Sequence, residues 1–212
     1  MKLYYDPRST YSQKTLIALY EKRASFTPVV VDLTDPADRA ALAKLSPLTK
    51  VPVLVLDDGW RIPESSIIIE YVDTHVSTGT RLIPDDADLA RQTRFHDRLA
   101  DLYVNDASKK IATDSLEPEG RHDPRVITAA HQQLDAMFDG LDGHLAERTW
   151  IMGDAFTMAD CALIPGLARC RTLHPFARWK YLAAYAARAF ERPSVLQVHQ
   201  EIAPYMARPG AP

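Results

Sequence analysis

Four hydroxyl groups stand side by side in Ser9-Thr10-Tyr11-Ser12, which follows a short β-prone run and opens a predicted helix. Serine and threonine are favoured N-cap residues, so capping of that helix alone explains them. The same position also allows chemistry, because a helix N-terminus has unpaired N–H groups and a partial positive charge that favour an anion. A ligand thiol placed there would be held as its thiolate.

The energies suffice for such a thiolate. Lowering the pKa of a free thiol, about 8.5, by two units requires about 2.7 kcal/mol. One hydrogen bond to a charged group supplies roughly 1.5–3 kcal/mol, and the helix dipole adds up to about 2 kcal/mol in a partly buried site. Neither a metal ion nor a protein cysteine is required.

Two further stretches could bind a peptide-like ligand. Pro52, which enters a predicted strand, is compatible with an ordinary trans bond, but a cis bond would turn the Val51 backbone outward to pair with a ligand like one more strand. Ser65 could simply cap the helix that follows it. That helix start could also bind a carboxylate while Glu64 pairs with an ammonium, and an α-amino acid head group carries both charges.

The first 75 residues alternate between strand and helix patterns, in the order β-α-β-α-β-β-α. Predicted strands lie at 2–5, 26–31, 51–56 and 60–62, and predicted helices at 10–23, 35–45 and 65–75. The β-branched run at 26–31 indicates a buried strand. Two parallel crossovers followed by a hairpin would give a small mixed sheet flanked by helices.

The rest of the chain has helical periodicity only. A long helix has an apolar seam at Leu89, Thr93, His96, Ala100, Tyr103, Ala107 and Ile111, and a second has Leu134, Phe138, Leu141 and Leu145. Helices at 157–172, 177–190 and 194–204 follow, the first with a capping box at Thr157 and Asp160. These patterns predict a domain at 1–76, a linker at 77–87, an all-helical domain at 88–205 and a flexible tail at 206–212.

Composition excludes several functions. A net charge of −3 argues against nucleic acid, and no apolar run is long enough to span a membrane. The first residues show no signal-peptide pattern, so a cytoplasmic location is expected. The two cysteines, Cys161 and Cys170, lie in one predicted helix and are expected to be core residues. Trp150 and Trp179 are expected to pack in the core of the helical domain.

In this order, the motifs resemble the cytosolic glutathione transferase superfamily over nearly the whole chain, from Met1 to about Ala203. The resemblance is carried by Ser9-Thr10-Tyr11-Ser12 and by residues 46–54, 63–71 and 153–160. It implies a thioredoxin-like N-terminal domain, an all-helical C-terminal domain, and glutathione as co-substrate without a metal. It further implies a bacterial-type enzyme with a serine or other hydroxyl in the active site.

The resemblance also implies roles for residues. Pro52 matches the family's cis-proline, and Val51 matches the residue whose backbone pairs with the cysteinyl part of glutathione. Glu64 and Ser65 match the pair that holds the γ-glutamyl end. Lys50 lies where a basic residue could reach the glycine carboxylate.

The hydroxyl that activates the thiol remains open at this point. Ser9 aligns with the serine of serine-type members and ranks first, followed by Thr10 and then by Tyr11, Ser12 and Tyr5. Because no cysteine is present there, mixed-disulfide chemistry is disfavoured. Attack of a glutathione thiolate on an electrophile is favoured instead.

The second substrate is expected to be a small hydrophobic electrophile, with Tyr11, Tyr103, His96 and Arg169 as candidate wall residues. Glutathione conjugation is the leading function. The alternatives are a non-catalytic protein-interaction module of the same fold and a dedicated glutathione-dependent dehalogenase or isomerase. The resemblance also implies a homodimer.

Overall fold

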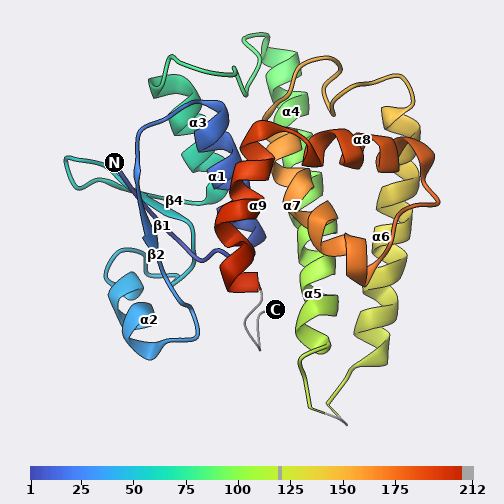
Figure 1. Cartoon of the computed structure of the whole chain (residues 1–212), viewed down its shortest axis with the longest axis horizontal. Coiled ribbons are helices and arrows are strands. Elements are labelled where there is room, and N and C mark those ends of the chain that lie inside the picture. Colours follow the sequence, from blue (N-terminus) through green and yellow to red (C-terminus); the bar gives the residue numbers. More distant parts are fainter. Residues whose placement is uncertain (119–120, 207–212) are drawn as a thin grey trace.

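The N-terminal domain is built on a four-stranded mixed sheet (Figure 1). The computed structural model describes residues 1–118 and 121–206. In the spatial order β2-β1-β3-β4, the strands are β1 (Lys2–Tyr5), β2 (Thr27–Val30), β3 (Val53–Val55) and β4 (Arg61–Pro63). β2 runs parallel to β1, whereas β3 is antiparallel to both β1 and β4. The predicted element order and the mixed sheet are confirmed.

Two details of the predicted sheet are wrong. Only the β1–β2 connection is a parallel crossover, because β3 returns antiparallel to β1. The segment between β2 and β3 is long enough for either direction, so element order could not decide. β2 is also mostly exposed rather than buried. It is an edge strand with one neighbour, and β-branched residues indicate a pleated surface more than burial.

Helices cover both faces of this sheet. They are α1 (Thr10–Glu21), α2 (Pro36–Ala43) and α3 (Ser65–His75). Alternate side chains of β3 show which face each helix covers. Leu54 belongs to the apolar cluster that includes α1 and α3, whereas Val53 packs with Leu42 of α2 on the opposite face. The helices α1 and α3 therefore lie together, on the side that faces the second domain (Figure 1).

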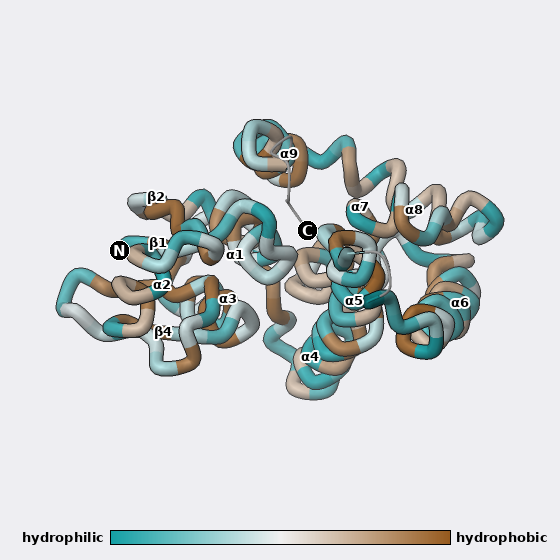
Figure 2. The backbone as a smooth tube through the Cα atoms, turned by 90° about the horizontal axis from the view of Figure 1, so that it is seen from below, coloured by the Kyte–Doolittle hydropathy of each residue, from teal (hydrophilic) through white to brown (hydrophobic). Residues whose placement is uncertain are grey.

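The second domain is helical throughout its described part, as predicted. Its elements are α4 (Ala87–Leu99), a π-helical segment (Ala100–Asn105), α5 (Asp106–Asp114), α6 (Pro124–Leu145), α7 (Met158–Leu173), α8 (Lys180–Phe190) and α9 (Pro193–Met206). Figure 2 shows the two domains side by side, with α9 returning over their junction. α7 packs against α1, α4 and the π-helical segment, so it joins the two domains.

The long helix was predicted only in part. It runs without a break from α4 through the π-helical segment into α5, but Leu89 and Tyr103 of its seam are 45% and 44% exposed. A π-turn holds more residues than an α-turn, which moves side chains such as Tyr103 to another face. Leu89 lies in the first turn of α4. The helical period shows which face of the helix Leu89 shares, but not whether another element covers that face.

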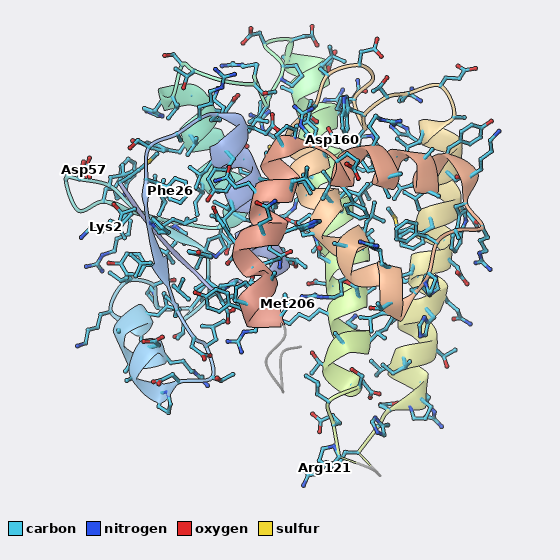
Figure 3. All side chains as sticks on the ribbon, in the orientation of Figure 1. Lys2, Phe26, Asp57, Arg121, Asp160 and Met206 are labelled. Carbon is cyan, nitrogen blue, oxygen red and sulfur yellow. The ribbon has the colours of Figure 1, made fainter. Side chains whose placement is uncertain are left out.

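The interior of the helical domain agrees with the sequence. Thr157 and Asp160 form the predicted capping box at the start of α7, and Asp160 lies inside the molecule in Figure 3. The expected core residues Cys161, Cys170, Trp150, Trp179 and the four seam residues of α6 are buried.

The domain limits given above stay a prediction. Of the predicted tail, Met206 ends α9 and residues 207–212 lie outside the described residues. None of the described helices is long and apolar enough to cross a membrane. Over residues 1–118 and 121–206, no group of His, Cys, Asp and Glu could hold a metal ion.

Candidate active site

A cavity of about 530 Å³ lies between the two domains. Its walls come from the β1–α1 loop, the segment before β3 and the start of α3 on one side, and from the π-helical segment, α5 and α7 on the other. The predicted site residues that line it are Ser9, Thr10, Tyr11, Lys50, Val51, Pro52, Glu64, Ser65 and Arg169. Tyr103 and His96 do not line it: Tyr103 is exposed, and His96 packs against His144.

Ser9 is the N-cap residue of α1. Its backbone is extended, and its Oγ accepts a long hydrogen bond of 3.4 Å from the backbone N–H of Ser12. The Ser9 O–H itself donates to no other described residue. A ligand atom in the cavity could therefore accept from this hydroxyl at the positive end of α1.

The other hydroxyls differ in their availability. Tyr11 donates its O–H to Asp106 Oδ1 at 2.8 Å, and burial together with that carboxylate raises the pKa of Tyr11 far above its usual range. Ser12 and Tyr5 are buried and do not line the cavity. Thr10 lines it and is almost fully buried. Ser9 and Thr10 therefore remain as hydroxyls that a ligand in the cavity could reach.

Val51 presents its backbone to the cavity wall. The Val51–Pro52 peptide bond is cis, as the resemblance implied. The Val51 side chain packs with Leu42 and Val53, which anchors the segment, while β3 begins only at Val53. Neither the N–H nor the C=O of Val51 bonds to another described residue. A peptide-like ligand could satisfy both groups.

The start of α3 carries an acid–hydroxyl pair, Glu64 and Ser65, in an unusual backbone conformation. The N-cap residue is Glu64, with φ 69° and no side-chain capping bond, and Ser65 is the first helical residue. The expectation that Ser65 caps α3 is wrong, because the chain turns one residue earlier. A positive φ at a glutamate costs about 1–3 kcal/mol, and such positions cluster at functional sites. The Glu64 carboxylate has no ion-pair partner among the described residues.

Comparison with known proteins places the chain in a family. Models described as the N-terminal and C-terminal domains of glutathione S-transferase match residues 3–79 and 124–188. Glutathione S-transferase 3 of Zea mays is 31% identical over 181 residues, which cover 82% of this chain and 81% of that protein. The chain belongs to the glutathione S-transferase family.

A solved structure and a further curated relative are similar to the chain over most of its length. A crystal structure of a glutathione S-transferase from Methylobacillus flagellatus with GSH bound has a TM-score of 0.85 and 30% identity, covering 93% of this chain and 98% of that one. The stringent starvation protein A homolog of Coxiella burnetii is 28% identical and covers 92% of this chain and 88% of that protein. The superfamily and the two-domain fold are thus confirmed, whereas the serine active site stays a prediction.

Several charged residues of the cavity were not predicted from the sequence. They are Asp6, Arg8, Arg98, Asp101, Asp106 and Lys109. Arg8, in the loop before α1, has its Nη2 2.9 Å from Asp6 Oδ2 and 2.6 Å from Asp32 Oδ1. These two ion pairs hold its side chain against acids of the same domain. Arg98 and Asp101 are three residues apart on one helix, a spacing that predicts an ion pair but not its position on a cavity wall.

A buried lysine network below the cavity was also missed. Lys14 is fully buried, with its Nζ 2.6 Å from Asp97 Oδ1 and 2.9 Å from Asp101 Oδ2. It also donates to Ser66 Oγ at 2.9 Å, next to the Glu64–Ser65 pair. Burial raises the pKa of Asp101, and Lys14 opposes that rise. This network ties α1, α3 and the long helix together, and a lysine amid the apolar positions of helix 10–23 was its signal.

Proposed function

We propose that this protein is a catalytic glutathione transferase that activates glutathione for attack on an electrophile. The observation that carries the proposal is one cavity that contains an acid–hydroxyl pair, an unpaired backbone and a helix N-terminus with a free hydroxyl. These three features could bind three different groups of one ligand, and a γ-glutamyl tripeptide has a matching group for each. The membership of the family supports the same reading.

Each part of glutathione has a counterpart in the cavity. The Glu64 carboxylate receives the α-ammonium, while Ser65 and the first N–H groups of α3 receive the α-carboxylate. The Val51 N–H and C=O pair with the cysteinyl residue. The Lys50 ammonium, which has no acidic partner among the described residues, receives the glycine carboxylate.

The reaction begins when the bound thiol loses its proton to solvent. The Ser9 O–H donates a hydrogen bond to the resulting thiolate, and the N-terminus of α1 adds its partial positive charge. The sulfur then forms a bond to an electrophilic carbon. In a displacement, the leaving group departs with the electron pair of its bond; in an addition, the π pair moves to the neighbouring carbon, which takes a proton from water.

The test is saturable glutathione binding by calorimetry, followed by conjugation of an aryl halide. Glu64→Gln should weaken binding about 10- to 100-fold, because it removes a charged hydrogen bond to the ammonium. Glu70→Gln is the matched control, since Glu70 lies farther along α3, pairs with Arg94 of α4 and does not line the cavity. Absence of saturable binding in the unmodified protein would overturn the proposal.

A second candidate is a binding module without turnover, favoured by the similarity to the stringent starvation protein A homolog. The pKa of the bound thiol separates the two. An enzyme must lower that pKa well below the free value of about 8.5, whereas a binding module need not. A dedicated dehalogenase or isomerase would also lower it, and substrate screening distinguishes that third option.

Homodimerisation and a cytoplasmic location belong to the same proposal. Ile67 on α3 and Phe95 on α4 are 53% and 57% exposed, which supports an apolar contact surface beside the cavity. A dimer would elute from size-exclusion chromatography at twice the chain mass of 23.8 kDa. Elution as a monomer across micromolar concentrations would contradict it.

A further inference from the structure

The cavity holds more positive groups than its own acids neutralise. Its basic side chains are Arg8, Lys50, Arg98, Lys109 and Arg169. Arg8 forms ion pairs with Asp6 and Asp32, and Arg98 forms one with Asp101. No ion pair to a described residue forms at the other three, Lys50, Lys109 and Arg169.

The acids of the cavity cannot supply the missing partners. Asp6 and Asp101 are already paired, and Asp106 accepts the O–H of Tyr11. Among the described acids of the wall, Glu64 and Asp106 form no ion pair. The proposed function assigns Glu64 to the ammonium of glutathione, and Asp106 forms its bond to Tyr11 instead of to Lys109 or Arg169. Lys50 is assigned to the glycine carboxylate in the same way. Lys109 and Arg169 are therefore left, both on helices of the second domain.

Arg169 stands close to the place of the reacting sulfur. It comes from α7, and its Nη2 donates to the backbone C=O of Arg8 at 3.2 Å, one peptide bond before Ser9. Its remaining N–H donors contact no acceptor in the described part of the chain. Burial between α1 and α7 lowers the pKa of Arg169, yet a guanidinium stays charged at neutral pH.

A half-buried cation without an anion is costly unless a ligand provides one. The planar fork of a guanidinium matches a carboxylate better than any other common group. Leu102 and Ala112, which line the same cavity from the second domain, add apolar surface to the wall that contains Lys109 and Arg169. The wall thus suits a small molecule with an apolar body and one anionic end.

We propose that the second substrate is a carboxylate-bearing electrophile, with Arg169 binding the carboxylate beside the thiolate and Lys109 adding positive charge at the cavity wall. The inference rests on the proposed function and refines its expected hydrophobic electrophile. Arg169 holds the substrate by its carboxylate so that the carbon next to it faces the sulfur. With an α-halo acid, the S–C bond forms as the C–halogen bond breaks, and halide leaves with the bonding pair.

Iodoacetate and iodoacetamide form a matched pair of probes, because they differ in a carboxylate against an amide and both lose iodide to the thiolate. The measurement is kcat/KM for each, divided by its uncatalysed rate constant with glutathione. The unmodified protein should favour iodoacetate about 10- to 100-fold on this corrected scale, the range of one hydrogen bond to a charged group. Arg169→Gln should abolish the preference, and Arg169→Lys should keep part of it.

Arg171→Gln is the matched control, an exposed arginine two residues along α7 that does not line the cavity. For Lys109→Gln, which should reduce the preference less than Arg169→Gln, the control is Lys110→Gln, outside this cavity. Equal loss with both probes in Arg169→Gln would mean that Arg169 acts on the thiolate, and it would overturn the inference. So would a corrected ratio near one in the unmodified protein.

Binding of the two products gives a readout that needs neither turnover nor a variant. S-Carboxymethylglutathione should bind the unmodified protein with a dissociation constant at least about tenfold lower than that of S-carbamidomethylglutathione. Equal binding refutes the carboxylate site while leaving the proposed function intact. If neither product nor glutathione itself binds, the proposed function and the inference fall together. Tighter binding of the carboxymethyl product without turnover of any electrophile would support the site and refute the enzyme.

Discussion

Replacement of Ser9 by alanine tests the origin of thiol activation. The Ser9 hydroxyl donates to no described residue in the free protein, so within the protein the change removes only the bond that it accepts from the backbone N–H of Ser12. That bond, at 3.4 Å, is long. Loss of the cap should therefore cost stability near the lower end of the usual range of about 0.5–2 kcal/mol.

The effect on the thiol should be larger than the effect on folding. A hydrogen bond to a thiolate contributes about 1.5–3 kcal/mol, and one pKa unit corresponds to 1.36 kcal/mol. Ser9→Ala should therefore raise the pKa of bound glutathione by about 1–2 units. Turnover near neutral pH should fall about 10- to 100-fold and recover at alkaline pH, while the affinity for glutathione changes by less than about threefold.

The assay is an ultraviolet titration of the thiolate in the binary complex, together with the pH profile of kcat. Asp86→Ala is the control for capping alone, because Asp86 caps α4 and does not line the cavity. It should lower the melting temperature without moving the thiol pKa. An unchanged pKa of the bound thiol in Ser9→Ala would refute the reasoning. If that pKa rose in Thr10→Val instead, the role would belong to Thr10.

Three further changes test the interior. Lys14→Met leaves the buried Asp97 without a cation and Asp101 with Arg98 alone. It should destabilise the protein by about 3–5 kcal/mol and lower Tm by roughly 10 °C in calorimetry. The control Arg94→Gln, which breaks an exposed pair, should cost less than about 1 kcal/mol. Thr157→Ala removes the capping box and should cost about 1 kcal/mol, with glutathione affinity unchanged; a comparable loss of affinity would contradict this. Burial lowers the pKa of His96 to about 4. Because the unfolded histidine takes up its proton first, the free energy of unfolding should fall between about pH 6.5 and 4, by less than about 3 kcal/mol since the ring is partly exposed. Chemical denaturation of His96→Gln should show a flatter profile in that window, with His122→Gln as control, and an unaltered profile would count against this source.

The elements that rest on local chemistry were predictable. Helix starts follow from capping and turn residues, and α1 begins at Thr10 after its Ser9 cap, as expected. The cis bond before Pro52 and the position of the Glu64–Ser65 pair came from the family resemblance, because their meaning depends on the order of motifs along the chain. A cap can be read from a few consecutive residues, whereas these two features required the whole order of motifs.

Features that depend on distant residues were not predictable. The direction of β3 depends on which end of the sheet the chain re-enters, and the element order contains no information on that. Tyr103 faces outward because a π-helical segment changes the helical phase, which a period of 3.6 cannot anticipate. The ion pairs of Lys14 reach residues more than 80 positions away. Sequence spacing identifies neighbours along one element but not across two domains.

The division of the cavity between the domains explains why the tripeptide half was easier to recognise than the other half. Glutathione has fixed groups, and the contacts proposed for it are short motifs on the N-terminal domain. The Lys14 network holds the start of α3 in place against the long helix. The proposed contacts of the second substrate are single side chains, Lys109 and Arg169, on two helices of the other domain. A substitution at either would change the electrophile without disturbing the grip on glutathione. The unpaired charge of Arg169, rather than any motif, is therefore the feature that should decide which electrophile this protein accepts.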